Sequence, residues 1–250
     1  MQQTPSPPTA RPLDSSCWPF RKPPTWLCQT GCSCSAWYVC SPNRESGSSS
    51  TWAPGIPTQG NVHETAQSIA PDSRVLYVDI NPVAVVASNE ILIGNPHCHA
   101  IQADLTRPQL ILDALTDSDL ATTIDLDQPT ALLYCAVLHM IPDDRIADVV
   151  APIRDRLVPG SAMVISHAST AVTDLFGESS VSAAKGVFRT QAATEVTART
   201  DEQIMALFDD MTLMPPGLVS LSDWRPELSD PDPYASTPTR SPIHGAAGTR

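Results

Sequence analysis

Residues 74–82 read RVLYVDINP, and this stretch decides the fold of the chain. It begins with a short, nearly continuous apolar run, which is typical of a parallel strand that is buried on both faces. The run ends at Asp79, and Asn81 and Pro82 come shortly after it. Asn is a favoured helix cap and Pro suits the first helical turn. The stretch therefore predicts a buried strand that leads through an acidic turn directly into a helix.

The same alternation of strand and helix continues on both sides of this stretch. Further strands are expected over residues 97–104, 130–139 and 161–169. Helices are expected over residues 61–70 (capped by Asn61), 81–94, 107–115, 145–157 (with a kink at Pro152) and 201–210. An edge strand and a connection are expected within residues 211–226. Four alternations predict a doubly wound α/β sheet with helices on both faces.

Composition divides the chain into three segments. Residues 1–54 hold five of the seven cysteines and four of the five tryptophans, but only two of the 27 acidic residues. They show no periodicity, so we expect them to be irregular or disordered. Residues 55–226 carry the regular alternation and form the expected domain. Residues 227–250 are rich in proline and are expected to be a tail that is mostly loop; a short final strand there is the alternative, without support from periodicity.

The charge of the chain narrows the range of partners. The formal net charge is -12. A nucleic acid or an anionic membrane surface needs a basic footprint, so we expect neither as a partner. No run of about 18 apolar residues predicts a membrane-spanning helix. No apolar segment near the first residue resembles a secretory signal, so the expected compartment is the cytoplasm.

Acidic residues stand at the ends of two neighbouring strands. Asp79 ends the first and Asp104 ends the second, and ligands of an open α/β sheet bind outside these strand ends. The two oxygens of Asp79 can accept hydrogen bonds from both hydroxyls of a ribose, and Asp104 can accept one from an adenine amine. The alternative is that each acid only caps a helix or a turn.

Histidines and cysteines provide weaker candidates. His139 and His167 stand near the ends of later strands, where a histidine can act as a general base or simply bond the loop. His63 is expected to be exposed. Cys98 and Cys135 are expected to be buried, inert thiols. The spacing of Cys28, Cys32, Cys34 and Cys40 lacks two well-separated Cys pairs, so no metal site is expected.

Several motifs together resemble the S-adenosyl methyltransferase family, first catalogued as a domain of unknown function. They are GIPTQGNVHETAQSIAPDSRVLYVDINPVAV, IQADLTRP, ALLYCAVLHMIPDD, LVPGSAMVISHAS and PGLVSLSDWRP, in order from Gly55 to Pro226. The resemblance implies a class I, Rossmann-like fold that binds S-adenosylmethionine and methylates a small molecule or another acceptor. It implies that the cofactor site contains Gly55, Asp79, Ile80, Ala103, Asp104, Leu105 and Ala136. It also implies that residues 136–139 line the methyl-transfer side, with His139 as the candidate catalytic residue.

The chain departs from this family immediately before Gly55. There the family has a strand and a glycine turn of the form F-L-D-[LI]-G-T, whereas residues 49–54 read SSTWAP. With the synonymous codons AGT TCC TCG ACC TGG GCA CCG for residues 48–54, a shifted frame reads Phe-Leu-Asp-Leu-Gly-Thr. We therefore expect residues 1–54 to be an out-of-frame, non-native sequence. The first strand and the glycine turn would then be missing or degraded.

Three functions remain open at this point. The chain is an active methyltransferase, an impaired relative that lacks an intact glycine turn, or another Rossmann protein with an adenosine cofactor. A nicotinamide dehydrogenase would need a G-x-G-x-x-G turn before residues 74–79, and the sequence has none. The residues indicate neither the acceptor nor the oligomeric state.

Overall fold

The computed structural model describes residues 35–39, 62–117, 120, 123–171, 196–224 and 243–250. Its strands are β1 (Ser35–Val39), β2 (Arg74–Asp79), β3 (Cys98–Gln102), β4 (Thr130–Cys135), β5 (Ala162–Ala168), β6 (Thr212–Leu213), β7 (Val219–Ser220) and β8 (Ile243–Thr249). Its α-helices are α2 (Val62–Ile69), α3 (Pro82–Ile91), α4 (Pro108–Asp117), α5 (Ile146–Arg154) and α8 (Asp201–Met205). Short 3-10 helices are η3 (Leu138–Met140), η4 (Ala206–Phe208) and η5 (Leu221–Asp223).

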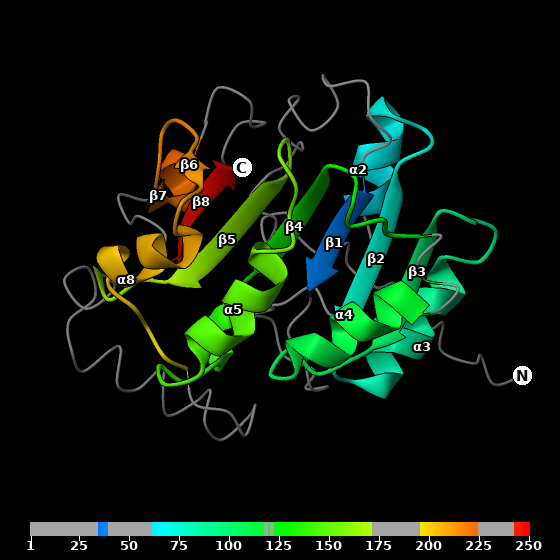
Figure 1. Cartoon of the computed structure of the whole chain (residues 1–250), viewed down its shortest axis with the longest axis horizontal. Coiled ribbons are helices and arrows are strands. Elements are labelled where there is room, and N and C mark those ends of the chain that lie inside the picture. Colours follow the sequence, from blue (N-terminus) through cyan, green and yellow to red (C-terminus); the bar gives the residue numbers. More distant parts are fainter. Residues whose placement is uncertain (1–34, 40–61, 118–119, 121–122, 172–195, 225–242) are drawn as a thin grey trace, which may run out of the picture.

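The strands form one sheet in the order β3-β2-β1-β4-β5-β8-β6, with β7 also paired to β8 (Figure 1). Strands β1 to β5 are parallel, whereas β8 runs antiparallel to β5, β6 and β7. The strand order reverses between β1 and β4, which is the switch point where open α/β sheets bind ligands.

Alternate side chains of β2 explain why helices cover both faces. Leu76 and Val78 belong to a buried cluster with residues of α4, α5, α8 and η4. Val75 and Tyr77 belong to a second buried cluster, which includes residues of α2 and Trp224. Both clusters continue through β4 and β5. The nearly continuous apolar runs of these strands therefore build two cores, and the predicted α/β sheet with helices on both faces is confirmed.

The centre of the sheet differs from the expectation. We expected the first strand to be missing and residues 1–54 to be irregular, but Ser35–Val39 forms β1 between β2 and β4. Trp37 pairs with Leu76 on one side and with Leu132 on the other. The backbone N–H and C=O groups of β2 and β4 need partners at the position between these strands, so a segment with strand-forming residues is stabilised there. SAWYV is such a segment, because it contains Trp, Tyr and Val. The other residues of segment 1–54 lie outside the described residues. So do the expected position of the glycine turn and the expected helix cap Asn61.

The C-terminal end of the chain also differs from the expectation. We expected residues 227–250 to be a tail, but residues 243–249 form β8, which pairs with β5 along its whole length. Gly245 and Gly248 let this strand pass close to its neighbours, because a Cβ atom at Gly248 would lie 2.8 Å from Cδ1 of Phe208. The fold therefore extends beyond Pro226, and residues 225–242 lie outside the described residues.

Several smaller boundaries also shift. The third expected strand ends at Cys135 instead of residue 139, since the chain turns at Ala136 and enters η3. The edge strand expected within residues 211–226 is divided into β6 and β7. Pro152 lies inside α5 as expected.

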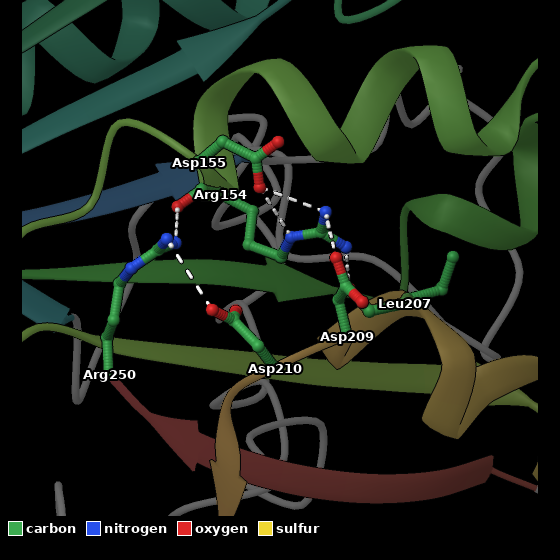
Figure 2. Close-up of polar contacts among 6 residues, drawn as sticks. All are labelled: Arg154, Asp155, Leu207, Asp209, Asp210 and Arg250. Atoms are coloured by element: carbon green, nitrogen blue, oxygen red, sulfur yellow. Dashed lines mark hydrogen bonds and ion pairs between the residues drawn. The ribbon is translucent and has the colours of Figure 1, made fainter.

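A buried arginine stabilises the structure near the amino-terminal ends of the strands, away from their carboxyl ends (Figure 2). Arg154 ends α5, which leads toward the amino end of β5. Its guanidinium donates to the carboxylates of Asp155 and Asp209, at 2.9 Å each, and to the carbonyl of Leu207 at 3.1 Å. These contacts join α5 to η4.

The last residue extends the same network. Nη1 of Arg250 donates to the Arg154 carbonyl at 3.1 Å, and Nη2 lies 3.7 Å from Asp210 (Figure 2). Its backbone pairs with Gly160 and Ser161 at 3.0 Å. The end of β8 is therefore held to α5 and to the start of β5.

Candidate functional site

The carboxyl ends of the parallel strands meet at one edge of the sheet. Asp79 at the end of β2 is in register with Gln102 at the end of β3, and the Asp79 carbonyl accepts a hydrogen bond from Ala103 N at 3.0 Å. At the next strand ends, Ala136 N donates to the Ser166 carbonyl at 3.1 Å. The structure therefore brings the predicted residues of both strand pairs to the same edge.

Asp79 is buried and has one carboxylate oxygen without a partner. Its side chain is 6% exposed, and Oδ1 accepts from Asn81 N at 2.8 Å. Oδ2 is buried and has no hydrogen-bond partner among the described residues. The cap of α3 is Asn81 itself, whose Oδ1 accepts from Val83 N at 2.9 Å. Asp79 therefore stabilises a turn with one oxygen and leaves the other for a ligand.

The surroundings of Asp79 oppose its charge. Burial raises the pKa of this carboxyl to about 6, although the backbone N–H groups of Asn81 and Ile80 lower it in part. A buried carboxylate with an unpaired oxygen is costly unless a donor meets it. A pair of ribose hydroxyls would supply such donors.

The expected adenine side is more open. Asp104 is half-buried, and its Oδ1 accepts from both the backbone N–H and the hydroxyl of Thr106, at 2.9 and 2.8 Å. Leu105 is buried, and Ala103 is half-buried. Ile80 is 47% exposed, so an apolar side chain is available at the end of β2. The combination suits a flat, partly apolar ring with a polar edge.

Ala136 has an unusual backbone conformation at the end of β4. Its φ is 52°, in the left-handed region that non-glycine residues rarely adopt. Its N–H donates to the Ser166 hydroxyl at 2.9 Å in addition to the Ser166 carbonyl. The bend stops the strand and turns the chain into η3. Strained backbone of this kind is concentrated at functional sites.

His139 follows this bend, in η3, and its ring is buried. It is 7% exposed, and Nδ1 has no hydrogen-bond partner among the described residues. Its ring meets that of His167 edge to face, with the centroids 5.7 Å apart. Burial, with smaller contributions from the neighbouring His167 and Arg199, lowers the pKa of His139 to about 3. The ring is therefore neutral at physiological pH.

The sequence did not reveal Arg199, which is the largest of the most deeply buried side chains described. It contacts His167, two carbonyls of the η3 region and Asp143. Its position in the sequence gives one indirect signal: Thr200 and Gln203 form a capping box, which fixes the start of α8 directly after it. Nothing in the local pattern distinguishes a buried arginine from an exposed one.

The remaining candidates have simpler environments. His63 was expected to be exposed, but it is buried, with 7% of its surface exposed. Its Nδ1 lies 2.8 Å from the Tyr77 hydroxyl, which holds the ring against β2. Cys98 and Cys135 are buried thiols as expected, and burial raises their pKa values to about 11 and about 12. Gly55 lies outside the described residues.

The described residues contain neither a metal-binding cluster nor a membrane-spanning helix. Within them, no group of three or more His, Cys, Asp or Glu residues is arranged to hold a metal ion. In the same part of the chain, no helix has both the length and the apolar character needed to cross a membrane.

Solved structures share this architecture. A putative methyltransferase from Thermobifida fusca YX superposes with a TM-score of 0.70 at 29% identity, covering 90% of this chain and 76% of that one. A DUF574 family protein from Streptomyces avermitilis MA-4680 gives 0.68 at 24% identity, with coverages of 90% and 81%. A SAM-dependent methyltransferase from Anabaena variabilis gives 0.54 at 15% identity, with coverages of 86% and 76%. No curated protein matches the chain.

The family model provides the assignment. The model described as S-adenosyl methyltransferase matches residues 52–250, which include both acidic strand ends, η3, Arg199 and β8. The unpaired oxygen of Asp79 fits a ribose, and the structural neighbours share the Rossmann-like sheet. The chain belongs to the S-adenosyl methyltransferase family and is a methyltransferase that uses S-adenosylmethionine.

Proposed function

We propose that this protein transfers a methyl group to a small-molecule acceptor in the cytoplasm, with the cofactor held across the ends of β2, β3 and β4. Asp79 binds the ribose hydroxyls. Ile80, Ala103, Asp104 and Leu105 surround the adenine. The buried, unpaired Oδ2 of Asp79 is the observation that carries this proposal, because a buried acceptor without a partner calls for a donor from a ligand.

Gly55 and Ala136 complete the proposed cofactor site. Gly55 would end the turn that receives the methionine part, and Ala136 would face the reactive end. S-adenosylmethionine, when bound, supplies an electrophilic methyl group. The protein then has to hold the acceptor atom in line with that group, and such positioning can contribute roughly 7–11 kcal/mol to lowering the barrier.

His139 has a limited role in this proposal. A ring whose pKa is about 3 does not retain a proton at neutral pH. We assign His139 to hydrogen bonding with the acceptor through its unpaired Nδ1, and not to storing the acceptor's proton. The proton that the acceptor loses would then pass to water or buffer.

Calorimetric titration with S-adenosylmethionine tests the cofactor site. Asp79→Ala should weaken binding by about 2–4 kcal/mol, because it removes two charge-assisted hydrogen bonds. Asp125→Ala is the matched control, since its Oδ1 also accepts the N–H two residues later, at 2.9 Å, but it precedes β4 at the opposite edge. Equal affinities of wild type and Asp79→Ala would refute the assignment of Asp79.

An impaired relative is the second candidate, supported by the connection before α2. Residues 40–61 join β1 to α2, whereas a strand and the next helix of such a unit are usually joined by about 2–6 residues. The hexapeptide of the shifted frame, Phe-Leu-Asp-Leu-Gly-Thr at residues 49–54, would lie much closer to α2 in the sequence than β1 does. The nucleotide sequence around the Gly55 codon tests this: if no single-base shift restores that hexapeptide, the out-of-frame origin is wrong.

A further inference from the structure

A buried arginine joins the ends of β4 and β5 on the expected methyl-transfer side. Arg199 is 1% exposed and makes none of the proposed cofactor contacts. Its backbone runs beside the end of β5, because Arg199 N donates to the Ala168 carbonyl at 3.0 Å and Thr170 N donates to the Arg199 carbonyl at 2.9 Å. These two bonds fix the origin of the side chain.

The guanidinium reaches both ends of η3. Nη1 donates to the Leu138 carbonyl at 3.1 Å, and Nη2 donates to the Ile141 carbonyl at 2.7 Å. Nη2 also lies 2.9 Å from Oδ1 of Asp143. A planar, forked cation can satisfy several acceptors at once, which a lysine cannot do with the same geometry. The turn that carries His139 is therefore held from both sides.

The same guanidinium specifies the protonation of His167. Nη1 of Arg199 lies 2.8 Å from Nε2 of His167, and an arginine can only donate, so Nε2 is the acceptor. Nδ1 of His167 lies 2.9 Å from the Ala168 carbonyl, which can only accept, so Nδ1 carries the proton. These two partners are consistent only with a neutral ring in the Nδ1–H tautomer.

We infer that Arg199 is a positioning residue of the methyl-transfer side. It fixes η3 and holds His139 and His167 as a pair of neutral imidazoles, with His167 in the Nδ1–H tautomer. The role of η3 in methyl transfer rests on the proposed function. The state of the two rings does not depend on it.

The charges around the pair support a neutral state. Arg199 is paired with Asp143, and the two rings meet edge to face. His244, in register with His167 on β8, has its Nδ1 2.8 Å from Asp201 of α8. Protonating either ring would add a second buried cation beside Arg199. The carboxylate that pairs with Arg199, that of Asp143, is largely exposed.

Nitrogen-15 NMR of the histidine rings tests the inference on the full chain. In the wild type, we expect the His167 signals of an Nδ1–H tautomer, and no titration of His139 or His167 between pH 5 and 8. The signals of His99, which is exposed, serve for comparison with those of the two buried rings. A mixture of tautomers, or titration of either buried ring between pH 5 and 8, would overturn the inference.

Substitutions separate positioning from a structural role. In Arg199→Met, the affinity of His167 for the second proton, which makes the ring a cation, should rise at least about tenfold. The reason is that a neighbouring cation is removed while Asp143 remains. Arg154→Met is the matched control, since it removes another buried, ion-paired arginine at the opposite sheet edge and should leave both rings unchanged. Unchanged rings in Arg199→Met would overturn the inference.

A conservative variant covers the case in which Arg199→Met does not fold. Arg199→Lys keeps the charge but loses the fork, so the rings should stay neutral while His167 loses its single tautomer. Retention of a pure Nδ1–H tautomer in Arg199→Lys would contradict the role of the fork. Titration with S-adenosylmethionine on the same samples keeps the two proposals apart: a neutral pair without cofactor binding refutes the proposed function alone.

Discussion

Asp79 shows at the scale of one residue how the burial of a carboxylate opposes stability. Its pKa is raised to about 6 in the folded chain and is near 3.9 when unfolded, so the folded state binds the proton more tightly. The folded state is therefore penalised as the pH rises through this window. Asp79→Asn should raise the free energy of unfolding by about 2 kcal/mol at pH 7.5 and by nearly nothing at pH 4.

Urea unfolding at several pH values measures this effect. Asp125→Asn, at an exposed turn of similar geometry, should change stability little at either pH. S-adenosylmethionine should stabilise the wild type but not Asp79→Asn, and wild-type affinity should fall as the pH drops below 6. A wild type that is more stable than Asp79→Asn at pH 7.5 without cofactor would contradict the burial penalty.

Ala136 provides a second test at this scale. The left-handed conformation costs a non-glycine residue about 1–2 kcal/mol, and glycine relieves it at some expense in unfolded-state entropy. Ala136→Gly should therefore raise the free energy of unfolding by about 0.5–1 kcal/mol. Ala131→Gly, in the extended and buried part of β4, should lower it instead. Destabilisation by both substitutions in a denaturant titration would show that Ala136 is unstrained.

The sequence indicated some of the candidate residues and not others for a physical reason. Asp79 and Asp104 were predictable because a strand end has a clear pattern, a buried run followed by a polar residue. Arg199 was not, because its burial depends on carbonyls and a histidine from segments far away in the chain. Its acceptors are created only when β4, β5 and η3 come together.

At the scale of elements, β8 depends on close packing by glycine. A Cβ atom at Gly248 would lie 2.8 Å from Cδ1 of Phe208 and 3.3 Å from Cβ of Met211. Gly248→Ala should lower the free energy of unfolding by about 1–3 kcal/mol through overpacking. Denaturant unfolding of Gly248→Ala, alone and combined with Phe208→Leu, measures this contact.

The double mutant is the discriminating sample. Phe208→Leu should be less destabilising with Gly248→Ala than alone, because the smaller side chain makes room for the methyl group. Additive losses would mean that the end of β8 does not lie against η4.

The same glycines explain why periodicity did not predict β8. Its only β-branched residues, Ile243 and Thr249, stand at its two ends, and most residues between them are small because the neighbours leave little space. The strands β2, β4 and β5 were recognised because each is buried on both faces and has a nearly continuous apolar run. The position of β1 is a different case, because β2 and β4 define it by pairing with the strand on both sides.

At the scale of the whole molecule, the out-of-frame hypothesis predicts that the in-frame chain places another segment at the centre of the sheet. In the chain as written, Ser35–Val39 occupies it. If residues 49–54 were replaced by Phe-Leu-Asp-Leu-Gly-Thr, the proposed in-frame segment would lie closer to α2 and should displace β1. Trp37→Pro separates the two arrangements, because proline cannot donate to the ladder of a central strand. It should lower the free energy of unfolding of the chain as written by at least about 2 kcal/mol and leave the replaced chain unchanged.

Thermal unfolding with and without S-adenosylmethionine reads both properties from the same four proteins. A ligand at about 100 times its dissociation constant stabilises a folded state by about 2.7 kcal/mol. We expect this gain in the replaced chain, with or without Trp37→Pro, and a smaller gain in the chain as written, whose residues 49–54 do not provide the family's glycine turn. Equal sensitivity of both chains to Trp37→Pro would mean that Ser35–Val39 is the native central strand. The out-of-frame origin of residues 1–54 would then be wrong.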